Sequence, residues 1–160
     1  MPKLLLHGEV RHPARWDVAR LRAALPEHRA PVTFDCATNG PQRHVFDGVL
    51  LRDVVLGAEP LFDARRRKDR ARHLLTVTGA DGHHAVLSWS ELDEDFGDSP
   101  VLLATRLDGI DLDPVGPQLV VPTDRCGARY VSGVTHVWFG ALPALVHAAP
   151  DPVPRHARGA

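Results

Sequence analysis

The segment VTGADGHHAVLSWSELDEDFGDSPVLLATRLDGIDLDPVGPQLVVP, residues 77–122, decides the fold. It joins short apolar runs through turn-forming residues: one turn lies at 79–82, and Asp108-Gly109 forms another. Asp-Gly pairs favour tight hairpin turns because Gly adopts positive φ without strain. A short helix is expected from Ser90, capped by Ser88 or by Ser90 itself. The segment therefore predicts strands linked by tight turns, with little helix.

The flanking sequence continues this pattern. We expect strands at 4–10, 32–36, 73–78, 84–87, 101–107, 119–121 and 130–139, short helices at 17–25 and 49–56, a loop at 37–43 and a solvated arginine-rich segment at 64–72. About eight to ten short strands in mixed sheets with three or four short helices predict an α+β, β-rich domain. This domain is expected to span residues 1–147, and the Pro-rich tail 148–160 is expected to be disordered.

Composition excludes several classes of protein. The chain has 160 residues, 44% of them hydrophobic, and a net charge of −1, so it does not have the charge of a nucleic-acid binder. It has no apolar run of about 20 residues, so no membrane span is predicted. The apolar run at the N-terminus is too short for the core of a signal peptide, so we expect a cytoplasmic protein. Its richness in Arg, Ala, Pro and Gly is typical of a GC-rich bacterial genome.

General catalytic motifs are absent from the sequence. It contains no Gly-rich phosphate loop, nucleophile elbow or metalloprotease helix. The one adjacent histidine pair is His83-His84, and neighbours on a strand point to opposite faces, so this pair is not expected to chelate one metal ion. Zinc sites need three or four converging ligands, and no spacing here predicts them.

Cys36 is the residue that suggests chemistry. It ends a strand and opens a loop that contains Thr38, Asn39 and Gly40, whose backbone N–H groups could stabilise a thiolate. Thiolates are soft ligands for transition metals. The alternative is a small buried apolar residue, as most free cysteines are. In the cytoplasm, Cys36 and Cys126 are both expected to be reduced thiols.

Four segments occur in an order that points to a family. TFDCATNG (33–40) is similar to a T-x-E-C-A-G-N segment, and HVFDGVLLRDVV (44–55) to W-x-G-V-P-L-x-D-L-L. Residues 77–122 are similar to a long central run that ends in G-P-x-R-L-V-V-P, and DRCGARYVSGVTHVWF (124–139) to a closing K-x-x-A-R-W-V-x-x-V-x-x-I. Together they resemble the sulfite oxidase-type molybdopterin-binding domain superfamily, over nearly the whole chain.

The resemblance implies the fold of that family and a molybdenum–molybdopterin cofactor. Cys36 would be the protein's sulfur ligand to the metal, with Asn39 as a neighbouring donor. Arg125 and Arg129 would hold the pterin phosphate or a small oxyanion or oxide-type substrate, because guanidinium donates paired hydrogen bonds to such anions. For Arg129 the alternative is an ion pair with Asp124. The implied function is an oxidoreductase that transfers an oxygen atom or two electrons.

Departures from the family pattern leave a second function open. Thr38 replaces a Gly, His83 a Tyr, and the Arg before the L-V-V-P run is absent. The longer N-terminal segment of the family has no counterpart in this sequence, so we also expect a pterin site that is open to solvent. A homodimer or a partner chain would then supply the missing wall. The rival function is a cofactor-free binding or interaction module that keeps the fold. A thiol redox sensor that uses Cys36 is a third alternative, and it requires an exposed sulfur with a low pKa.

Overall fold

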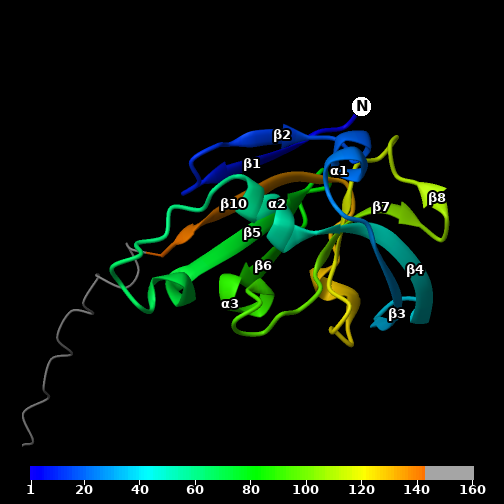
Figure 1. The fold of residues 1–160 in the computed structure, drawn as a ribbon. Helices are drawn as coiled ribbons and strands as arrows, with labels where there is room; N and C mark the ends of the chain where they lie inside the picture. Colours follow the sequence, from blue (N-terminus) through cyan, green and yellow to red (C-terminus); the bar gives the residue numbers. More distant parts are fainter. Residues whose placement is uncertain (143–160) are drawn as a thin grey trace, which may run out of the picture.

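Two five-stranded β-sheets form the body of the protein, and short helices pack around them (Figure 1). The structure is a computed structural model that describes residues 1–142. Its strands are β1 (Leu4–Gly8), β2 (Ala14–Trp16), β3 (His28–Cys36), β4 (Gly40–Leu50), β5 (His73–Gly79), β6 (His84–Ser88), β7 (Leu102–Leu107), β8 (Ile110–Asp111), β9 (Gln118–Val120) and β10 (Val134–Ala141). Its helices are α1 (Val18–Ala24), α2 (Leu51–Gly57) and α3 (Trp89–Leu92), with 3-10 turns η1 (Asp69–Arg72) and η2 (Gly127–Arg129). The predicted β-rich fold with short helices is confirmed.

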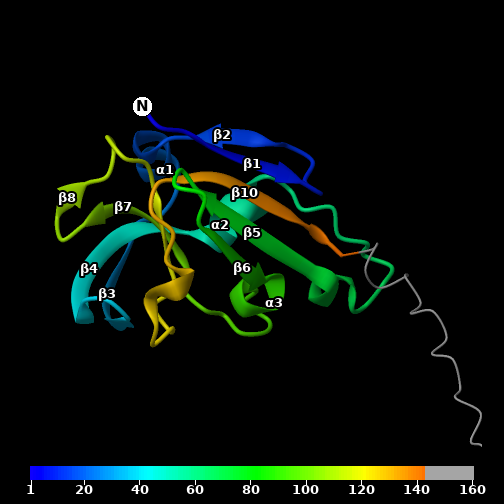
Figure 2. The ribbon, with the colours of Figure 1, turned by 180° about the vertical axis from the view of Figure 1, so that it is seen from behind.

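The first sheet is mixed and has the order β2-β1-β10-β5-β6. Strand β1 runs parallel to β10, and the other neighbours are antiparallel. In β5, Leu75 and Val77 are buried, whereas Leu74, Thr76 and Thr78 are half-buried. Because side chains alternate across a strand, one face of this sheet forms the core and the other faces outward. Figure 2 shows β1, β10 and β5 in front of α1 and α2, so these helices lie on the core side.

The second sheet is antiparallel, with the order β3-β4-β7-β8 and β9 paired to β7. Its long hairpin pairs β3 with β4 from His28↔Gly48 to Cys36↔Gly40. The sequence predicted a loop at 37–43, but only residues 37–39 lie between the strands. Gly40 adopts φ +70°, which lets the chain turn tightly and begin β4 at once.

The core lies between the two sheets and under the helices. Its largest fully buried side chains include Trp89, Phe46 and Phe139, and the ring centroids of Trp89 and Phe139 lie 5.5 Å apart. Burying a Phe side chain contributes about 1.5–3 kcal/mol. These residues come from three segments that lie far apart in the sequence, so the core closes only when both sheets have formed.

Capping residues set where two of the helices begin. Asp17 accepts a hydrogen bond from the Arg20 N–H at 2.8 Å at the start of α1. At α3, the Ser88 hydroxyl accepts from the Glu91 N–H at 3.2 Å, and the Glu91 carboxylate accepts from the Ser88 N–H at 2.8 Å. Of the two caps that the sequence allowed, Ser88 is therefore the one used, in a capping box.

Two further expectations concern the chain as a whole. The predicted boundary between the domain and a tail at 148–160 lies outside the described residues. None of the helices within residues 1–142 has the length and apolarity needed to cross a bilayer.

Candidate functional site

Cys36 is the last residue of β3, at the tip of the β3–β4 hairpin. Its side chain is not packed in the core, because the residue is only half-buried and Sγ lies 3.3 Å from the Thr38 hydroxyl oxygen. Hydrogen bonds from this hydroxyl and from the backbone N–H groups of Thr38 and Asn39 hold the pKa of Cys36 below its ordinary value. The hairpin turn thus stabilises a thiolate, as the sequence suggested.

The segment that precedes η2 runs beside this end of β3. The Asp35 N–H donates to the Arg125 carbonyl at 2.8 Å, and Asp35 pairs with Cys126 in a parallel bridge. A Cβ atom on Gly127 would lie 2.7 Å from the Phe34 ring, so the segment approaches the strand closely only because residue 127 is Gly. The hairpin and the segment therefore form one continuous surface.

Strand alternation decides which side chains of this segment share a face with Cys36. Cys126 has an extended backbone, with φ −106° and ψ 140°. Residues 125 and 127 therefore face one side of this segment, and the Cys126 side chain faces the other. Gly127 faces Phe34, and Phe34 and Cys36 are two residues apart on β3. Arg125 therefore points to the face of Cys36, and Cys126 points to the other. Arg125 is exposed, and within residues 1–142 its guanidinium forms no ion pair.

Arg129 is already bonded to carboxylates. Its Nε and Nη2 atoms donate to the two carboxylate oxygens of Asp124, each at 2.8 Å, and Nη1 donates to Glu91 at 2.9 Å. These bonds, first with Asp124 and then with Glu91, raise the pKa of Arg129. Nη1 also lies 3.4 Å from the Val86 carbonyl oxygen, so four of the roughly five guanidinium N–H groups have protein acceptors. The pairing with Asp124 is the alternative that the sequence left open.

Tyr130 packs beside the same strand. Its ring centroid lies 4.5 Å from that of Phe34, so the ring packs against β3. Its hydroxyl is buried and has no hydrogen-bond partner in the described part of the chain, and burial raises the pKa of Tyr130 to about 12. Buried hydroxyls are rarely left unpaired, so this orphaned donor is an exception within the described residues.

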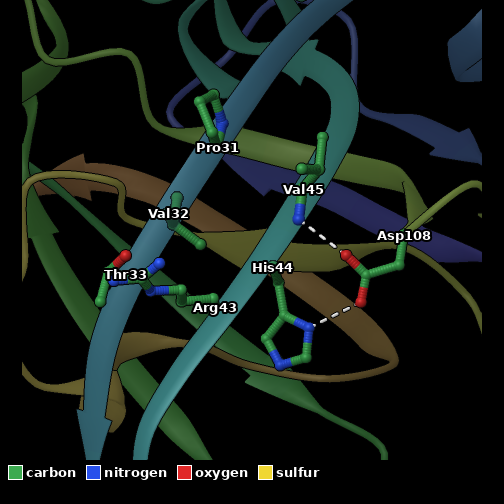
Figure 3. Close-up of a pocket in the computed structure, with 7 residues that line it drawn as sticks. All are labelled: Pro31, Val32, Thr33, Arg43, His44, Val45 and Asp108. Carbon is green, nitrogen blue, oxygen red and sulfur yellow. Dashed lines mark hydrogen bonds and ion pairs between the residues drawn. The ribbon is translucent and has the colours of Figure 1, made fainter.

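A groove of about 370 Å³ lies along the same hairpin (Figure 3). The His44 Nδ1 atom lies 2.7 Å from an Asp108 carboxylate oxygen, and the other oxygen accepts from the Val45 N–H at 2.8 Å. These bonds, first from Val45 and then from His44, lower the pKa of Asp108. The groove is lined by Pro31, Val32, Thr33, Arg43, His44, Val45 and Asp108.

Sequence reasoning missed this groove, and none of the four predicted site residues lines it. The only local signal was the Asp108-Gly109 turn, where Asp108 adopts φ 51° and Gly109 φ 79°. His44 and Asp108 lie 64 positions apart in the sequence, so their pairing depends on the β4–β7 register.

The adjacent histidines His83 and His84 have different hydrogen-bond partners. His83 lies 2.8 Å from the Ala128 carbonyl oxygen through Nε2, whereas Nδ1 of His84 lies 3.0 Å from the Thr78 hydroxyl. The adjacent pair therefore has separate partners. Over residues 1–142, no group of three or more His, Cys, Asp or Glu side chains is placed to hold a metal ion.

Comparisons with known proteins agree with this architecture. The sequence profile of the family described as "Oxidoreductase molybdopterin binding domain" matches residues 3–141. Among solved structures, the chain is similar to the sulfane dehydrogenase SoxCD from Paracoccus pantotrophus, with a TM-score of 0.67 and 19% identity. That match covers 88% of this chain but 39% of the other. No curated protein matches the sequence.

Proposed function

Because the chain belongs to the family of oxidoreductase molybdopterin-binding domains, we propose that it binds a molybdenum–molybdopterin cofactor through Cys36 and acts as an oxidoreductase. The observation that carries this proposal is the Cys36 thiol, which lies outside the core with its pKa lowered by the turn that follows it. A thiolate held in this way is the form in which cysteine binds a metal.

The surrounding residues fit part of such a group. Cys36 would supply one sulfur to the metal, and the Asn39 N–H helps to keep that sulfur ionised. Arg125 lies on the same face and could hold a phosphate or an oxyanion. Arg129 could contribute to anion binding only by exchanging Asp124 or Glu91 for the ligand.

The cofactor, when bound, supplies a molybdenum centre for oxygen-atom or two-electron transfer. This chain's own residues would hold the sulfur ligand ionised and orient the anion through Arg125. We propose a small oxyanion or oxide-type substrate, a cytoplasmic location, and a second copy or a partner chain that completes the wall of the site.

The charge balance of Arg129 favours a second function, a cofactor-free binding module on the same fold. A guanidinium that already donates to two carboxylates cannot also grip a phosphate through two parallel hydrogen bonds. Fold alone does not fix function, so the two proposals differ at the site. A thiol redox sensor would use the same half-buried sulfur with its lowered pKa.

Metal and pterin content decides between these functions. The full chain is produced in a host that makes molybdopterin, and molybdenum and released pterin are measured per chain. In the wild type and in Cys126→Ser we expect partial or no loading of the monomer and tight loading only of oligomers, and we expect neither molybdenum nor pterin in Cys36→Ser. Equal, near-zero content in all three proteins, in both monomer and oligomer fractions, would favour the cofactor-free module.

A further inference from the structure

The outward face of the first sheet carries three histidines. His7 lies on β1, His136 on β10 and His84 on β6, and all three are half-buried or exposed. Their strand neighbours Leu6 and Val137 are fully buried, so the alternation of the strands places the histidines on the side away from the core. Figure 2 shows this side of β1 and β10 with α1 and α2 behind the sheet.

Two of these histidines are neighbours across parallel strands. The register pairs Leu5 with His136 and His7 with Trp138, so the two imidazoles lie diagonally on one face. Their ring centroids are 6.0 Å apart, with an angle of 78° between the ring planes. Metal–nitrogen bonds of about 2.0–2.1 Å put each centroid about 3.2 Å from a shared ion, so two ligating rings lie about 5.2 Å apart at the tetrahedral angle and at most about 6.4 Å. The observed 6.0 Å corresponds to a nitrogen–metal–nitrogen angle of about 140°, so a rearrangement of about 0.8 Å would bring the two rings to the tetrahedral angle.

Hydrogen bonds fix the tautomer of His136. The Thr135 hydroxyl donates to the Thr78 carbonyl at 3.2 Å, so its oxygen must act as the acceptor for the His136 Nδ1–H, 3.0 Å away. The lone pair of the neutral ring is then on Nε2. Metal-binding histidines commonly have their second nitrogen held in this way, which orients the ring and strengthens the ligand.

We propose that His7 and His136 form a two-histidine site for a divalent transition-metal ion such as Zn²⁺ or Cu²⁺. Imidazole nitrogen suits these ions, and water would complete the coordination. Neither side chain forms an ion pair with a carboxylate in the described part of the chain. The site is separate from Cys36 and does not depend on the proposed cofactor.

Zinc titration of the full chain, with its thiols blocked by iodoacetamide, tests this site by calorimetry. Removing a residue that only orients a metal ligand lowers metal affinity by about 10–100-fold. Removing a ligand should cost at least as much, so His7→Asn and His136→Asn should each weaken the tightest zinc site at least tenfold. The double variant should be no weaker than either single variant, because each alone already destroys the chelate. Thr135→Val should give a smaller loss.

His84→Asn is the matched control, because His84 lies on the same sheet face but bonds to Thr78 instead of a second histidine. It should leave the tightest zinc site unchanged. Survival of that site in the His7/His136 double variant would overturn the proposal, as would an equal loss in His84→Asn. Additive losses in the two single variants would also overturn it, because they would indicate independent histidines.

Discussion

Replacing Arg129 with Met tests whether its ion pairs hold the segment before β10 in place. The substitution keeps much of the aliphatic stem and removes the guanidinium that joins Asp124 to Glu91. Asp124 lies on this segment and Glu91 on α3, so the variant cuts a connection between two parts of the chain that are distant in sequence. Loss of these bonds should destabilise the domain and loosen the surface beside Cys36.

The structure sets the size of the expected loss. Three charge-assisted hydrogen bonds are removed, and each such bond contributes about 1.5–3 kcal/mol when well shielded. The Arg129 side chain is 32% exposed and that of Glu91 37%, so solvent screening and non-additivity reduce the sum. We expect a loss of about 2–3 kcal/mol, which for a domain of this size lowers the Tm by about 5–10 °C.

Urea denaturation, followed by tryptophan fluorescence, measures this loss as a change in midpoint at constant slope. Arg65→Met is the matched control, because Arg65 forms one ion pair with Asp63 and its side chain is 91% exposed. That control should change the free energy of unfolding by less than about 0.5 kcal/mol. If Arg129→Met also falls within about 0.5 kcal/mol of the wild type, the structural role assigned to Arg129 is wrong.

Three further outcomes follow from the same geometry. Thr38→Val should raise the pKa of Cys36 by removing its hydroxyl partner, which would move the pH profile of iodoacetamide alkylation upward; an unchanged profile would contradict the assigned cause. Asp108 has a lowered folded pKa, so its contribution to stability is present above about pH 4 and is lost as the pH falls through the folded value. Asp108→Asn should therefore flatten the acid limb of the stability curve, and an equally steep limb would refute this. Gly127→Ala should cost about 1–3 kcal/mol, because its Cβ would meet Phe34, and Phe34→Leu should recover part of the loss if that contact is the cause.

Local pattern was enough to predict most of the fold. The alternating runs at 73–78 and 84–87 became β5 and β6, and the Asp-Gly turns formed where predicted. The full length of β3 and β4 was not predictable, because these strands contain Pro31, Pro41 and several charged residues and lack clear alternation. Their extent is set by nine paired positions between the two strands and by pairing with β7, which no short window of sequence reveals.

The site was predicted less completely than the fold. Cys36 could be singled out because a strand end followed by a Gly-containing turn is a local feature, and the turn does lower its pKa. For Arg129, the sequence predicted either a bound anion or an ion pair with Asp124. It did not predict the bond to Glu91, because that residue lies 38 positions away. For the groove with His44 and Asp108, the sequence showed only the Asp108-Gly109 turn, because the pairing of the two residues forms only when β4 and β7 come together.

Counting hydrogen-bond donors shows where the two leading functions separate. Phosphate recognition by guanidinium uses two parallel N–H groups, and Arg129 keeps about one N–H without a protein acceptor. On the Cys36 face, Arg125 is therefore the residue available to hold an anion. Under the proposed function, Cys36 would hold the molybdenum centre, and one available guanidinium would hold the cofactor's phosphate only weakly. A second chain that supplied one more cation to this face would correct that imbalance, which is why occupancy should be measured in monomer and oligomer fractions separately.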